Sequence, residues 1–127
     1  MMHSRHFLLE EAQNELKKIE QKVRRMVSLK TTIDEKSYNL YRHHFFTGGP
    51  DNGEKYYPEV LELISILKEC LKRGVLVKGI DNGLADFPCI RQNGEEVNLC
   101  WKLGEEEILY GHHINNGFAG RKPVLTL

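Results

Sequence analysis

Cysteine is scarce in this chain, and its pattern excludes a disulfide scaffold. Three cysteines, Cys70, Cys89 and Cys100, occur among 127 residues, and none lies in a Cys-x-x-Cys pair. The odd number excludes a fully paired set of intramolecular disulfides, so a reducing compartment fits the sequence best. The first residues also lack the apolar core of a secretory signal, and Glu10 and Glu11 follow at once. We therefore expect a cytoplasmic protein.

A long apolar run and an excess of either charge are also missing. The longest mostly apolar stretch, 60–71, contains Glu62, Lys68 and Glu69 and is too short to span a membrane. Lysine plus arginine and aspartate plus glutamate each total 18, so the formal net charge is zero. This balance argues against nucleic acid or an anionic membrane as an obligatory partner. It also leaves little electrostatic repulsion against self-association.

What the chain does contain is the composition of a folded domain. Hydrophobic residues make up 40% and charged residues 28%, which is typical of a globular protein rather than a disordered one. A chain of 127 residues is long enough to bury a core of its own. We expect a single domain over residues 1–127.

The first half carries a heptad pattern that predicts one long helix over residues 9–44. Its stripe positions alternate spacings of three and four, with two polar interruptions. These positions are Leu9, Ala12, Leu16, Ile19, Val23, Met26, Lys30, Ile33, Ser37 and Leu40. Such a helix is longer than a compact domain of this size needs. We therefore expect its overhang to contact a partner or to fray.

A second helix is predicted over residues 57–73, after a loop at 46–54 that is rich in Gly, Pro, Asn and Asp. Pro58 suits the first helical turn, and Gly74 can take the left-handed conformation that ends a helix. The short link predicts that the two helices form an antiparallel hairpin. Because the first helix is overlong, we expect a homodimer or higher oligomer through this hairpin.

From Val75 onward the apolar period changes to two, which predicts an antiparallel meander over residues 75–114. Asn93-Gly94 suits a two-residue hairpin turn, because both residues tolerate positive φ. We expect the resulting face of the sheet to pack on the helices. Its predicted cross-strand pairs are Ile90 with Val97, Pro88 with Leu99 and Asp86 with Trp101.

The last strand ends in two adjacent histidines, His112 and His113. Turn lengths of two to four residues all fit at 104–106, and a slip of one residue exchanges which histidine faces the core. Residues 115–127 are predicted to be an irregular tail. The fold class is therefore α+β: a long antiparallel helical hairpin followed by a three- to four-stranded antiparallel β-meander.

Several short motifs, most of them in the C-terminal half, together resemble one known family. They are Phe7-Leu8-Leu9-Glu10-Glu11-Ala12, Gly83-Leu84-Ala85-Asp86-Phe87-Pro88, Leu99-Cys100-Trp101-Lys102-Leu103-Gly104-Glu105, His112 and Gly117-Phe118-Ala119-Gly120-Arg121-Lys122-Pro123. They resemble the bacterial family known as domain of unknown function 2203. The resemblance implies a small bacterial protein whose relatives lack an assigned activity. It supplies a class of protein and no reaction.

This chain departs from that family's pattern at two places. Leu8 stands where the family has threonine, which is a natural N-cap residue for a helix. Gly111-His112-His113 stands where the family has Trp-His-Glu. The missing tryptophan and carboxylate weaken any site that is built on the last strand.

The candidate site is a cluster of polar residues in the strands: Asp86, Cys100, His112 and Arg121, with Trp101 as a further ligand-binding candidate. Aspartate and histidine are metal ligands or an acid–base pair, and cysteine beside histidine is an activated thiolate. Arg121 would clamp an oxyanion or a phosphate. The sequence requires no cofactor, and a divalent metal on Asp86 and His112 is compatible with it. Asp81 and His113 are more distant candidates for the same cluster.

Two geometric expectations count against this site. His112 and His113 are neighbours on a strand and point to opposite faces, so both cannot easily reach one metal. The predicted register likewise places Asp86 and Cys100 on opposite faces. A structural interpretation therefore stays open, in which Asp86 pairs with Arg121 or satisfies turn amides. In that case Cys100 is a small core residue and His112 is a hydrogen-bonded residue of the sheet.

Two functions follow from these observations. The first is an interaction protein that oligomerises through its helical hairpin and presents the sheet to a partner. The second is an enzyme or sensor that depends on a metal or an anion bound at the C-terminal sheet, with an unknown small-molecule ligand. The segment 117–122 contributes to the second function as an anion-binding loop, or it is a tight turn that buries Phe118.

Overall fold

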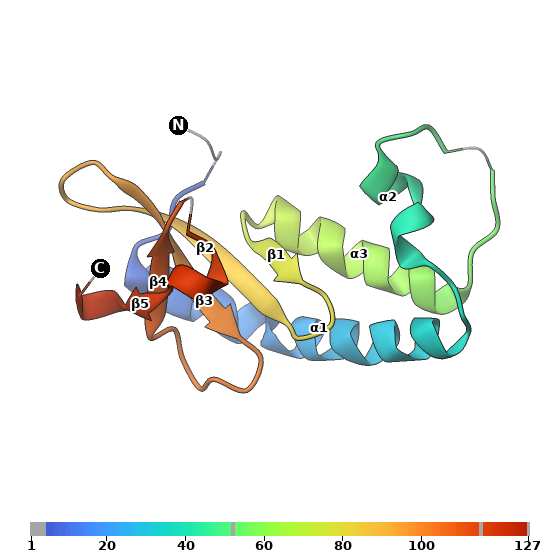
Figure 1. Cartoon of the computed structure of the whole chain (residues 1–127), viewed down its shortest axis with the longest axis horizontal. Helices are drawn as coiled ribbons and strands as arrows, with labels where there is room; N and C mark the ends of the chain where they lie inside the picture. The colour runs from blue at the N-terminus through green and yellow to red at the C-terminus, as the bar shows by residue number, and fades with distance from the viewer. Residues whose placement is uncertain (1–4, 52, 115, 127) are drawn as a thin grey trace.

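A long helix, a second helix and an antiparallel sheet make up the molecule, as Figure 1 shows. The structure is a computed structural model and describes residues 5–51, 53–114 and 116–126. It confirms the α+β class. In chain order the elements are α1 (Leu9–Glu35), η1 (Leu40–Arg42), α2 (His44–Thr47), α3 (Pro58–Lys72), β1 (Leu76–Gly79), β2 (Leu84–Ile90), β3 (Glu96–Lys102), β4 (Tyr110–His113), η2 (Phe118–Gly120), β5 (Lys122–Pro123) and η3 (Val124–Thr126).

Helix α1 forms where the heptad stripe is apolar, because that stripe is the face it buries. Seven apolar residues of α1 are each at most 3% exposed, and all but Leu29 belong to the stripe: Ala12, Leu16, Ile19, Val23, Met26, Leu29 and Ile33. Leu9, the first stripe position, is 37% exposed. The Glu11 carboxylate accepts the Leu8 backbone N–H at 2.8 Å, which satisfies one free donor at the helix start. Two glutamates in the first turn also favour the positive end of the helix.

The predicted single helix over 9–44 is wrong, because α1 ends at Glu35. Ser37 takes a left-handed conformation with φ of 56°, and the Tyr38 N–H bonds back to the Ile33 carbonyl at 3.3 Å. This is the hydrogen-bond pattern of a helix C-cap, where glycine is usual. Leu40 is buried all the same, but it reaches the core from η1. The apolar position at the end of the stripe therefore does not mark a continuing helix.

Helix α3 matches the second predicted helix to within one residue at each end. Pro58 occupies its first turn, and Gly74 follows it with φ of 83°. α3 packs antiparallel on α1 (Figure 1), and an exposed ion pair between Arg25 and Glu62 at 2.7 Å also joins them. The link between the helices is longer and more structured than a hairpin turn, since η1 and α2 lie in it. The predicted hairpin is therefore only partly present.

Among the described residues the sheet has five strands in the order β1-β2-β3-β4-β5, and every neighbouring pair is antiparallel. The prediction of three or four strands missed β5, which lies in the segment expected to be irregular. β5 pairs with β4 through Tyr110 with Pro123 and Gly111 with Lys122. The tail therefore returns to the sheet and adds a short edge strand beside β4.

The predicted register of the β2–β3 hairpin is wrong by one residue. The strands pair Ile90 with Glu96, Pro88 with Asn98 and Asp86 with Cys100. The Arg91 N–H bonds to the Glu95 carbonyl at 2.8 Å, so the loop between them has three residues rather than two. Gly94 takes φ of 85° as the last residue of that loop, which is the usual place for a left-handed residue in three-residue hairpin loops.

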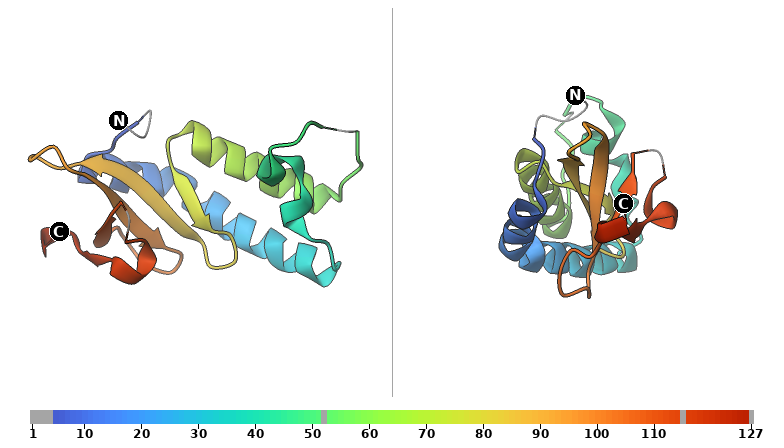
Figure 2. Two further views of the ribbon diagram at one scale, coloured as in Figure 1. Left: turned by 45° about the horizontal axis from the view of Figure 1, so that its top comes forward. Right: turned by 90° about the vertical axis from the view of Figure 1, so that its left-hand side faces the viewer.

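This register decides which residues face the helices. Ala85, Phe87, Leu99 and Trp101 lie in the hydrophobic core, each at most 2% exposed. Asp86 and Pro88 were predicted on that face and lie on the other one. Figure 2 shows α1 on one side of the sheet and the C-terminal segment on the other. No helix among the described residues is both long and apolar enough to cross a membrane.

Candidate metal centre

Four polar residues are buried on the face of the sheet that points away from α1. Asp86 of β2, Asn98 and Cys100 of β3, and His112 of β4 are at most 5% exposed. Asp86 lies directly opposite Cys100, and His112 lies directly opposite Asn98, so all four share one face. Buried polar groups cost free energy unless they are satisfied. This cluster is therefore the most informative feature of the sheet.

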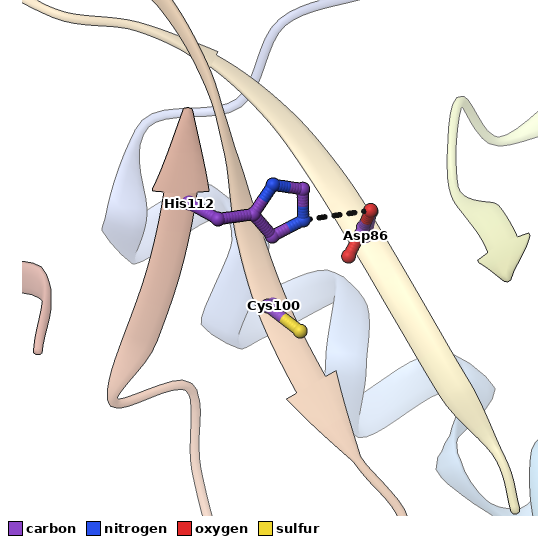
Figure 3. A group of neighbouring side chains, drawn as sticks. All are labelled: Asp86, Cys100 and His112. Carbon is purple, nitrogen blue, oxygen red and sulfur yellow. Dashed lines mark hydrogen bonds and ion pairs between the residues drawn. The ribbon is translucent and has the colours of Figure 1, made fainter. Parts of the chain in front are cut away.

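Three of these side chains converge as metal ligands do. One ligand atom from each of Asp86, Cys100 and His112 lies within 4.8 Å of the others. Figure 3 shows the three residues on three neighbouring strands, with the imidazole pointing across β3 towards the carboxylate. His112 Nε2 is 3.1 Å from Asp86 Oδ2. The two predicted geometric obstacles do not apply to this set, since Asp86 and Cys100 share a face and His113 is not a member.

The hydrogen bond on the other side of the imidazole sets its tautomer. His112 Nδ1 is 2.8 Å from the His113 carbonyl oxygen. A carbonyl oxygen only accepts, so Nδ1 carries the proton and donates it. In the neutral ring Nε2 then presents its lone pair to the Asp86 carboxylate. A cation between Nε2 and Oδ2, either a proton or a metal ion, satisfies both atoms. Metal-bound histidines have this arrangement, with the second ring nitrogen held by a carbonyl or carboxylate.

Cys100 is a protonated thiol in the metal-free site. Burial, which is the larger cause, and the nearby Asp86 carboxylate together raise the pKa of this thiol to about 12. Such a thiol is a poor nucleophile at neutral pH, because the thiolate is the reactive form. A metal ion would displace this proton, and its positive charge would then stabilise the thiolate.

Two buried hydrogen-bond acceptors of this cluster have no donor among the described residues. Within the described part of the chain, no donor reaches Asp86 Oδ1 or Asn98 Oδ1, and both atoms are buried. Each such atom costs about 1–3 kcal/mol when it loses water without gaining a partner. A bound cation would satisfy such an environment, since one oxygen, one nitrogen and one sulfur atom already lie within 4.8 Å of one another.

Arg121 lies beside the cluster and attaches the C-terminal segment to it. Its guanidinium donates to the Cys100 carbonyl at 3.3 Å and to both Glu105 carboxylate oxygens at 2.9 and 3.0 Å. It also lies over the rings of Tyr110 and Phe118, 4.2 and 4.7 Å from their centroids. These hydrogen bonds all use Nη2 and attach the C-terminal segment to the sheet, whereas Nε of the same guanidinium is buried and has no hydrogen-bond partner among the described residues.

The remaining predicted site residues lie elsewhere. Trp101 is on the opposite face in the core, where its Nε1–H donates to the Glu105 carbonyl at 2.8 Å. Asp81 lies 3.0 Å from the buried Lys30 ammonium, and His113 lies 3.4 Å from Glu95. Asn98 was not predicted, although a polar residue two positions before Cys100 on the same strand was the available signal.

The fold and the site together define an α+β protein with a buried Asp–Cys–His cluster on the sheet face that the C-terminal segment covers. The chain belongs to the family described as uncharacterized conserved protein (DUF2203), whose sequence model matches residues 5–124. This confirms the resemblance in the motifs. No curated protein and no solved structure matches the chain.

Proposed function

We propose that this protein binds one transition-metal ion of the Zn²⁺ type through Asp86, Cys100 and His112. A carboxylate oxygen, an imidazole nitrogen and a thiolate sulfur suit zinc and its neighbours, whereas magnesium and calcium prefer oxygen donors alone. The observation that carries the proposal is the His112 side chain. Its Nδ1 proton is fixed by the His113 carbonyl, and its Nε2 lies 3.1 Å from Asp86 Oδ2.

Binding or sensing fits this site better than catalysis. Asp86, Cys100 and His112 are 0–3% exposed, so a substrate has no open path to the ion while the C-terminal segment is closed. The ion would connect β2, β3 and β4, which supply one ligand each. Metal binding at such a site adds to the stability of the fold. A protein of this kind reports metal availability through its folded population.

Oligomerisation through the helices stays a prediction with less support than before. It was based on an overhang of the first helix, and α1 ends at Glu35 with its stripe already buried within this chain. The described residues offer exposed apolar side chains on α3, such as Leu61 and Leu71 at 54% and 57%. Native mass spectrometry of the untagged protein reports both the subunit count and any bound metal.

The experiment is a Zn²⁺ titration of chelator-treated protein, followed by native mass spectrometry and thermal melting. We expect one ion per chain and a rise in Tm. Loading with Co²⁺ should add a charge-transfer absorption from the Cys100 thiolate, which identifies sulfur as a ligand. Cys100→Ser should abolish this absorption and weaken metal binding by roughly 100-fold or more, since a ligand matters more than its supporting residues.

Two matched variants separate the site from its surroundings. Cys89→Ser alters a half-buried thiol of β2, and His113→Gln alters the adjacent imidazole. Both should bind Zn²⁺ as the unaltered protein does. The proposal is wrong if the unaltered protein takes up no ion, or if Cys89→Ser and Cys100→Ser reduce binding equally.

A further inference from the structure

A fourth polar residue, Asn98, lies beside the His112 side chain at the same centre. β2 and β4 each pair with β3, so the contact between His112 Nε2 and Asp86 Oδ2 spans the strand that lies between them. The imidazole therefore crosses over β3, as Figure 3 shows. Cys100 lies on β3 beside this crossing. Asn98 is two residues away on the same face, and it pairs directly with His112, so it flanks the imidazole on the other side.

Asn98 also carries an unsatisfied atom. The residue is 5% exposed, and its Oδ1 accepts no hydrogen bond from residues 5–51, 53–114 or 116–126. Buried side-chain amides in native proteins are normally satisfied, and an exception calls for a specific explanation such as a missing ion or water. A cation or a hydrogen-bond donor beside Asn98 Oδ1 would satisfy this atom. It would lie on the same face of the sheet as the ligand atoms of Asp86, Cys100 and His112.

We propose that Asn98 Oδ1 is the fourth donor to the metal ion and closes its coordination sphere to water. This inference rests on the proposed metal binding and specifies its geometry. Together with Asp86, Cys100 and His112, it gives two oxygens, one nitrogen and one sulfur, which is a complete tetrahedral set. Zinc sites with four protein ligands are structural, whereas catalytic sites keep one position open for water or substrate. The chain is thus a closed metal-binding protein and not a metal-dependent hydrolase.

The test asks whether the bound ion has an open position. Full-length protein is loaded with Co²⁺, and its visible spectrum is recorded during a titration with azide, a small anion that binds cobalt wherever a site is vacant or held by water. The spectrum of the unaltered protein should not change. Asn98→Ala should bind Co²⁺ with the same thiolate absorption, respond to azide, and bind Zn²⁺ roughly tenfold or more weakly.

Two further variants make the test selective. Asn98→Asp keeps an oxygen donor at the same place and adds a charge, so it should stay inert to azide and bind Zn²⁺ at least as tightly as the unaltered protein. It also carries the test if Asn98→Ala does not fold. Asn93→Ala removes an exposed asparagine from the β2–β3 loop and should behave as the unaltered protein does.

The outcomes separate this inference from the proposed function. An azide response in the unaltered protein, or unchanged affinity and azide inertness in Asn98→Ala, overturns the role of Asn98 and leaves metal binding intact. Failure of the unaltered protein to take up Co²⁺ overturns metal binding itself, and the role of Asn98 with it.

Discussion

The two faces of the sheet are equally buried, yet they are built from opposite kinds of residue. The face towards α1 presents Phe87, Leu99 and Trp101, whose burial drives folding through the removal of apolar surface from water. The other face presents Asp86, Asn98 and His112, which lose hydration when they are buried. Burial of the apolar face therefore stabilises the fold by itself. Burial of the polar face is favourable only when its lone pairs bind a proton or a metal ion.

The largest expected effect is on the apolar face. Trp101→Ala removes a fully buried indole and the hydrogen bond from its Nε1 to the Glu105 carbonyl. We expect the free energy of unfolding to fall by about 3–5 kcal/mol, measured by urea denaturation. Leu61→Ala, on the exposed side of α3, is the control and should cost about 0.5 kcal/mol or less. Equal losses in the two variants would contradict the assignment of Trp101 to the core.

A slightly smaller effect is expected on the polar face of the metal-free protein. His112→Ala leaves the buried Asp86 carboxylate without its partner, which should cost about 3 kcal/mol in chelator-treated samples. Replacing both residues by apolar ones, Asp86→Leu with His112→Phe, should restore stability to within about 1 kcal/mol. The double variant should also lose all response of Tm to Zn²⁺. A double variant less stable than His112→Ala would show that the polar pair itself stabilises the fold.

Arg121 attaches the C-terminal segment to the polar face, in addition to the pairing of β5 with β4. Arg121→Met removes two hydrogen bonds to the Glu105 carboxylate and one to the Cys100 carbonyl. We expect a loss of about 1–2 kcal/mol, because the side chain keeps some contact with solvent. Amide hydrogen exchange should speed up in residues 118–124 and stay unchanged in α1. Lys122→Met, at an exposed position of β5, is the control.

A further comparison concerns two buried thiols in alkaline solution. Burial raises the pKa of Cys70, in the apolar core, from 9.0 to about 11, and that of Cys100 to about 12. Both thiols have a lower pKa in the unfolded chain than in the folded protein. Their contribution to the free energy of unfolding is therefore fully present below about pH 9, and it is lost as pH rises towards the folded pKa values. Zn²⁺ should remove the part that comes from Cys100. Cys70→Ala should remove the pH dependence of stability that comes from Cys70. Both effects are measured as the slope of Tm against pH.

Metal affinity should depend on pH in the opposite direction. Zn²⁺ has to displace the proton of the Cys100 thiol, whose pKa lies far above neutrality. Affinity should therefore rise roughly tenfold per pH unit between pH 6 and pH 8 for one displaced proton. Competition with a chelator of known affinity measures this slope. A flat profile would mean that the thiol is not a ligand.

The position of α3, the α+β class and the family membership could all be predicted from the sequence. The members of the cluster were also found there, because Asp86, Cys100 and His112 are titratable residues in strands that otherwise bury apolar side chains. They were also grouped as one candidate cluster, but the predicted register placed Asp86 and Cys100 on opposite faces of the sheet, whereas they pair directly and share a face. Asn93-Gly94 fits both a two-residue and a three-residue loop, and the choice between them reverses the face of every residue along β2 relative to β3.

The sequence by itself determined the local preferences: the heptad stripe that α1 buries, the change to a period of two after Val75, and the turn residues between strands. Only the tertiary structure decided where α1 ends, that β5 pairs with β4 at the edge of the sheet, and which face Asp86 occupies. Local patterns cannot decide the strand register, because side chains alternate along a strand and both registers satisfy the same alternating pattern. Burial of Phe87 and Trp101 against the helices selects one register, and Asp86, Cys100 and His112 then meet on the other face.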